Sequence, residues 1–60
     1  MKHKVTINAG NDNVQVFHIH PRSIDRFIAK IREHASNLQL ACIVTIESER
    51  RGLLDTILIA

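Results

Sequence analysis

Polar and apolar residues alternate along the first third of the chain, which predicts two β-strands joined by a hairpin. Residues 4–8 (KVTIN) alternate polar with β-branched apolar side chains, a pattern typical of a strand with one buried face. Residues 9–13 (AGNDN) are turn-forming types, and residues 14–20 (VQVFHIH) alternate again. Pro21 ends the second strand because proline cannot donate a hydrogen bond to a ladder.

After Pro21 the apolar spacing becomes that of an amphipathic helix. Ser23 is a good N-cap, and Asp25 places a negative charge near the positive end of the helix dipole. Ser36 and Asn37 are predicted to end the helix. One helical stripe with i, i+3, i+4, i+7 and i+11 spacing is formed by Ile24, Phe27, Ile28, Ile31 and Ala35.

The remainder of the chain predicts a second pair of strands. Residues 38–48 (LQLACIVTIES) are rich in β-branched types, and residues 53–60 (LLDTILIA) are nearly all apolar. Residues 49–52 connect them, and Gly52 supplies the left-handed backbone position of a short hairpin loop.

The order strand, strand, helix, strand, strand predicts a single α+β domain over residues 1–60, with one helix packed on one face of a four-stranded sheet. This order resembles a β-grasp-like outline, in which the first and last strands pair in parallel at the centre. The apolar last strand suits such a central position. An order with the second and third strands adjacent is the alternative. The outline is common to many unrelated proteins and implies no function.

Phe17 and Ile19 are the larger apolar side chains of the second strand and favour a register that turns them toward the core, with Val5 opposite Phe17 and Ile7 opposite Gln15. His18 and His20 then face away from the core. A one-residue slip would instead align His3 with His18.

His18 and His20 share one face of their strand, a spacing that occurs in metal sites. In the favoured register Lys4 lies opposite His18 and Lys2 opposite His20. Because two ammonium groups beside two imidazoles repel a dication, this register favours an anion-attracting patch over a metal site. We therefore expect neither a metal ion nor a cofactor.

Composition narrows the function classes. The chain has 60 residues, 45% hydrophobic and 23% charged, which is typical of a soluble domain with a thin core. A single Cys excludes a disulfide framework and a Cys-based zinc finger, and Cys42 is expected to be buried. No stretch is apolar for the ~20 residues that a membrane span needs, so we expect a cytoplasmic protein that does not enter membranes.

The last two strands offer apolar groups to both faces of the sheet, although one helix covers only one face. An exposed apolar patch usually marks an interface, so we expect a homo-oligomer, first of all a dimer, joined by sheet faces or edges. A twisted monomer and a hetero-complex are the alternatives. The expected interface residues are Ala41, Ile43, Leu54 and Leu58.

The net charge of +2 is compatible with weak binding of nucleic acid or another anion. With two Phe and no Trp or Tyr, the chain has almost no means of stacking on bases. The basic and imidazole side chains assigned to such a surface are Lys2, Lys4, His18, His20, Arg22, Arg26, Arg50 and Arg51.

No catalytic constellation stands out, because the carboxylates are scattered and the serines lack a nucleophile context. We therefore expect a non-enzymatic, regulatory interaction module that self-associates and binds another macromolecule, most simply a protein. Weakly specific nucleic-acid binding is the alternative function. An oligomeric enzyme with a site shared between subunits is a lesser one.

Overall fold

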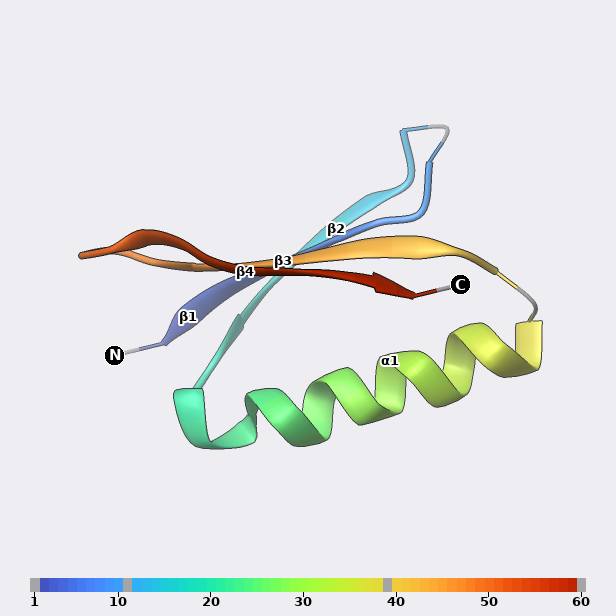
Figure 1. Ribbon diagram of the computed structural model, residues 1–60, viewed down its shortest axis with the longest axis horizontal. Coiled ribbons are helices and arrows are strands. Elements are labelled where there is room, and N and C mark those ends of the chain that lie inside the picture. Colours follow the sequence, from blue (N-terminus) through green and yellow to red (C-terminus); the bar gives the residue numbers. More distant parts are fainter. Residues whose placement is uncertain (1, 11, 39, 60) are drawn as a thin grey trace.

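The computed structural model describes residues 2–10, 12–38 and 40–59. Within these residues the elements follow the order β1, β2, η1, α1, β3 and β4, which confirms the predicted α+β class and ββαββ order (Figure 1). The 3₁₀ turn η1 spans Pro21–Ser23, and α1 spans Ile24–Leu38. The strands are β1 (His3–Asn8), β2 (Val14–Ile19), β3 (Cys42–Ser48) and β4 (Gly52–Ile59).

The strands form one sheet in the order β2-β1-β3-β4, and each neighbouring pair is antiparallel. The predicted parallel pairing of the first and last strands is therefore wrong, because β3 lies beside β1 and β4 is an edge strand. The alternative that placed the second and third strands together is also wrong, since β2 is the opposite edge. Asp55 supplies a physical reason: it pairs with the buried Ile46, and a central β4 would bury its carboxylate.

The register predicted for the first hairpin is confirmed. Observed pairs include Val5–Phe17, Ile7–Gln15 and Lys4–His18. The ladder ends at the His3–Ile19 pair, so the expected pair of Lys2 with His20 falls just beyond it. The larger apolar side chains of β2 thus decide which of its faces turns toward α1.

The chain enters α1 through η1 rather than at the expected cap. His20 is extended and its Nδ1 accepts the Arg22 N–H at 3.2 Å, which makes it the N-cap of η1. Pro21 takes the first position of the turn, where a missing N–H does no harm. The prediction of Ser23 as N-cap is wrong, because Ser23 is already inside η1 and its N–H donates to the His20 carbonyl at 2.8 Å.

The connection from α1 to β3 also differs from the prediction. The helix continues past the stop expected at residues 36–37 and ends at Leu38. The third strand, expected from Leu38, begins only at Cys42. Between them the Leu40 N–H donates to the Ala35 carbonyl at 3.0 Å, which holds the chain against the helix end. Asn11 of the expected hairpin loop and Gln39 and Ala60 of the expected strands lie outside the described residues.

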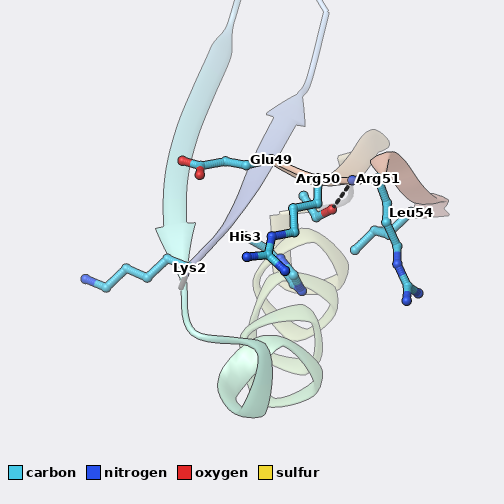
Figure 2. Close-up of a pocket in the computed structure, with 7 residues that line it drawn as sticks. Lys2, His3, Glu49, Arg50, Arg51 and Leu54 are labelled. Atoms are coloured by element: carbon cyan, nitrogen blue, oxygen red, sulfur yellow. Dashed lines mark hydrogen bonds between the residues drawn. The ribbon is translucent and has the colours of Figure 1, made fainter.

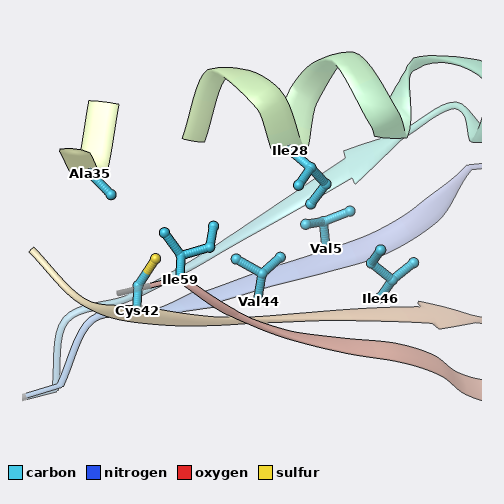
Figure 3. Close-up of a cluster of buried hydrophobic side chains, with 7 residues drawn as sticks. All are labelled: Val5, Ile28, Ala35, Cys42, Val44, Ile46 and Ile59. Carbon is cyan, nitrogen blue, oxygen red and sulfur yellow. The ribbon is translucent and has the colours of Figure 1, made fainter. Parts of the chain in front are cut away.

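The core is a single layer of side chains between α1 and the sheet (Figure 3). Val5 on β1 and Val44 on β3 are fully buried, which follows from their place on the two central strands. From α1, Ile28 and Ala35 are buried and the rest of the predicted stripe is half-buried against the same cluster. The seven buried residues are Val5, Ile28, Ala35, Cys42, Val44, Ile46 and Ile59.

The molecule exposes more surface than its mass requires. Its accessible surface is 4763 Å², whereas a compact monomer of this mass exposes about 4,000 Å². Its radius of gyration is 11.3 Å, against about 10.4 Å for a compact chain of this length. The excess of about 800 Å² follows from an open, two-layer shape in which none of the described elements covers the second face of the sheet.

Candidate functional site

The sheet face turned away from α1, here called the outer face, is covered by no element among the described residues (Figure 1). Its side chains alternate with the core residues of each strand and form three rows across the sheet. The hairpin row is Val14, Asn8, Ile43 and Leu58. The threonine row is Val16, Thr6, Thr45 and Thr56, and the charged row is His18, Lys4, Glu47 and Leu53.

The first two rows carry no charge and are largely apolar or β-branched. Val14 is 49% exposed, Ile43 45% and Leu58 71%, so a substantial part of the apolar surface faces solvent. Such a patch on a small chain is unusual, because monomers seldom leave contiguous apolar surface uncovered. The outer face is therefore the first candidate for an interaction surface.

The four residues expected at an interface occupy different positions. Ile43 and Leu58 are direct cross-strand partners in the hairpin row. Ala41 is exposed just before β3. Leu54 lies at a β-bulge, where Asp55 pairs with Ile46 and Leu53 with Glu47, so Leu54 has no partner opposite and is 43% exposed. Simple alternation along the sequence did not reveal this bulge.

A second candidate surface lies at one end of the sheet, here called the basic end. The start of β1, the end of β2, η1, the first turn of α1 and the β3–β4 turn all lie at this end of the molecule (Figure 1). Six of the eight Lys and Arg residues lie at this end, together with the acids Asp25, Glu47, Glu49 and Asp55, the last of which lines a hollow with Asp25, so the local charge is 6 − 4 = +2. The remaining ionised side chains, Lys30, Arg32, Asp12 and Glu33, sum to 2 − 2 = 0, so the net positive charge lies at one end.

The basic end is divided into two shallow hollows of about 230 Å³ each. Arg50 and Arg51 line the first with Lys2 and His3, and in Figure 2 the two arginine side chains extend the same way from the turn. The Arg51 N–H donates to Ser48 Oγ at 2.8 Å, which fixes the turn that carries both arginines. The left-handed Gly52, with φ of 71°, completes this turn as expected.

The second hollow is lined by Lys2, Lys4 and His18 together with Glu47 and Glu49. The structure thus gathers five of the eight expected anion-binding residues around two adjacent hollows. The other three, His20, Arg22 and Arg26, lie at the same end, on the segment that leads into α1. Carboxylates line both hollows, which weakens their attraction for anions.

A third feature was not expected from sequence. A groove of about 530 Å³ runs between α1 and the covered face of the sheet, on the side of the first hairpin. Its apolar lining includes Ile7, Phe17, Phe27, Ile31, Ala35 and Cys42. The sequence signal for it is weak: Ala35 is a small residue at a position of the helical stripe where a larger one would reach the sheet.

The remaining chemistry is sparse. Cys42 is buried, as expected, and Ser48 accepts a turn hydrogen bond. Among the described residues no group of three or more His, Cys, Asp or Glu side chains is placed to hold a metal ion. None of the described segments is a candidate for membrane insertion as a helix, since α1 has only 15 residues and carries charges along its length.

Comparison with protein-family models, with curated proteins and with solved structures gives no significant match for this chain. Functional inference therefore rests on the three surfaces described above.

Proposed function

We propose that this chain is a small non-enzymatic interaction module that pairs with a second copy of itself through the outer face. The observation that carries the proposal is the pair of uncharged rows on an uncovered sheet, with Ile43 and Leu58 side by side and largely exposed. Stacking two outer faces would remove the exposed parts of Ile43 and Leu58 from water.

Charge decides how the two faces are oriented. A two-fold axis that lies between the stacked sheets and runs across the strands would set the charged row of one copy on the uncharged hairpin row of the other. Lys4 would then face Asn8 and Glu47 would face Ile43, so neither would gain an opposite charge from the partner. A two-fold axis that runs along the strands, between β1 and β3, sets each row of one copy against the same row of the other copy. Lys4 of each copy then faces Glu47 of the other, and Val14 faces Leu58.

The same axis brings the two basic ends to one side of the dimer. Each contributes a local charge of +2, so the pair forms a broader positive surface than either chain alone. We propose that this surface receives the further macromolecule, and an acidic protein surface is the partner that its charge fits. Basic side chains line both hollows, so we propose that charge contributes to recognition there.

Sedimentation equilibrium over a series of protein concentrations tests the pairing. We expect a concentration-dependent equilibrium between 6.8 kDa and twice that mass, together with a melting temperature that rises with protein concentration. Leu58→Ser should weaken the dimer about tenfold, because each copy loses apolar contact at the interface. Leu38→Ser removes the same side chain from the end of α1, away from the outer face, and should leave the equilibrium unchanged. A persistent monomer at all concentrations would rule out the dimer.

A second candidate function, weak binding of nucleic-acid phosphates, is favoured by the concentration of basic residues at one end. Lys2, Arg50 and Arg51 line one hollow with their charged groups spread apart (Figure 2), and we assign one phosphate contact to each. For three contacts, raising salt from about 50 to about 200 mM should weaken binding to a labelled duplex about 40-fold. The measurement is fluorescence anisotropy at both salt concentrations.

The variant that tests this candidate is Arg50→Ala combined with Arg51→Ala. Only the Lys2 contact then remains, so the same increase in salt should weaken duplex binding by only roughly threefold to fourfold. The matched control is Lys30→Ala combined with Arg32→Ala, which removes two positive charges from α1 beyond its first turn. Equal losses in the two double variants, or no binding at low salt, would exclude a specific role for the basic end.

A further inference from the structure

The groove between α1 and the first hairpin results from how the helix is held above the sheet. At one end Phe17 on β2 meets Phe27 on α1 edge to face, with ring centroids 5.2 Å apart and planes at 62°. This pair holds α1 away from β2. Farther along the helix Ala35 is too small to fill the space that the aromatic pair creates, while the first hairpin curves away from α1 (Figure 1). The result is an open groove rather than a sealed core.

The lining has the composition of a small-molecule site. Its volume of about 530 Å³ lies within the ~300–1,000 Å³ range of ligand pockets, and most of its lining is apolar. Its rim is polar: Lys30 and His34 come from one face of α1, four residues apart, and Asn13 and Gln15 come from the hairpin side. None of the described residues that line the groove is acidic. An apolar body with a negatively charged head complements this distribution.

We propose that the groove binds a single-chain amphiphilic carboxylate, with its alkyl tail between α1 and the sheet and its carboxylate at Lys30 and His34. An alkyl chain suits the lining better than a peptide, because a peptide backbone would bring amide groups that the apolar walls cannot pair. The groove lies on the covered side of the sheet, so a dimer formed through the outer face leaves it open. The site therefore does not depend on the proposed self-association.

Decanoate below its critical micelle concentration is the probe, titrated into the full chain and followed by methyl NMR. We expect saturable binding of one decanoate per chain, with shifts at Ile7 and Ile31 in the groove and none at Ile43 and Leu58 on the outer face. Acetate, which has the head without the tail, should not bind. No saturation by decanoate, or shifts centred on the outer face, would overturn the proposal.

The head-group assignment has its own matched pair of variants. Lys30→Glu reverses a charge at the rim, whereas Arg32→Glu makes the same reversal on the same helix at a residue that does not line this groove. We expect the dissociation constant for decanoate to rise roughly fivefold in Lys30→Glu and to stay within about twofold in Arg32→Glu. The neutral alcohol decanol should be insensitive to both changes. Equal effects of the two variants on decanoate would refute recognition by Lys30.

The buried thiol gives an independent readout, because Cys42 lines the groove and is the one cysteine of the chain. Decanoate should slow the reaction of Cys42 with a thiol-specific reagent at least threefold at saturation, and acetate should not. This assay needs no variant and reports occupancy directly. Unchanged thiol reactivity at saturating decanoate would place the ligand elsewhere and overturn the assignment.

Discussion

Replacing Ile28 with alanine is expected to lower the free energy of unfolding by about 2–5 kcal/mol. Ile28 is buried and reaches from α1 to the cluster around Val5 and Val44. A chain of 60 residues has a total stability of about 3–9 kcal/mol at the usual value per residue. The variant should therefore be partly or largely unfolded at room temperature. Urea unfolding followed by circular dichroism measures the loss.

The control for this prediction is Arg26→Ala, which changes an exposed residue of the same helix. We expect its unfolding free energy to stay within about 0.5 kcal/mol of the original. The loss of unfolding free energy in Ile31→Ala should lie between the losses in Ile28→Ala and Arg26→Ala, because Ile31 is half-buried beside the open groove. Protein concentration must be equal in all experiments, since self-association would add to stability. Similar losses for Ile28 and Arg26 would contradict the packing described for α1.

Local sequence patterns predicted the elements and the first register well. Alternation in β2 offers two faces, and Phe17 with Ile19 outweighs Val14 with Val16, so one register buries more apolar area. The helical stripe followed from spacing alone, and Ile28 occupies its centre. These features depend on residues close in sequence, which is why one sequence was sufficient to predict them.

Strand order could not be predicted in this way. Both hairpins follow from short connections, but which strand of the second hairpin meets β1 depends on contacts between distant segments. The apolar run of β4 suggested a central strand. The same run also suits an edge strand if its apolar side chains on the outer face, such as Leu58, are covered by a second molecule. Asp55 was the informative residue, since its carboxylate is acceptable at an edge and costly at the centre.

The candidate surfaces also differ in whether local sequence patterns or contacts between distant segments form them. Sequence indicated an uncovered apolar face and named Ile43 and Leu58, which share a row. It did not reveal the bulge that leaves Leu54 with no residue opposite, because a bulge changes the pairing without changing the alternation in the sequence. The basic end arises from topology alone, since Lys2 and Arg50 are far apart in the chain and meet only through the pairing of β1 with β3.

The second large effect is expected from charge reversal in the proposed dimer. With the two-fold axis along the strands, Lys4→Glu sets the new carboxylate of each copy against Glu47 of the other, and Glu47→Lys sets a new ammonium group against Lys4 in the same way. Each variant alone replaces two attractive contacts with two repulsive ones, so each homodimer should weaken roughly a hundredfold. Mixed together, the two variants should form a heterodimer, because each glutamate then faces a lysine.

The mixing experiment separates the contact between copies from the contact within one chain. Lys4 and Glu47 are also neighbours across β1 and β3 of the same chain, so either reversal creates repulsion inside its own chain. That internal repulsion is the same in the homodimer and in the heterodimer, and only the pairing across the interface differs. Sedimentation of each variant and of the equimolar mixture, at low and high salt, measures the difference. A mixture no more associated than its components would exclude this axis, and an original chain that remains monomeric would exclude the dimer itself.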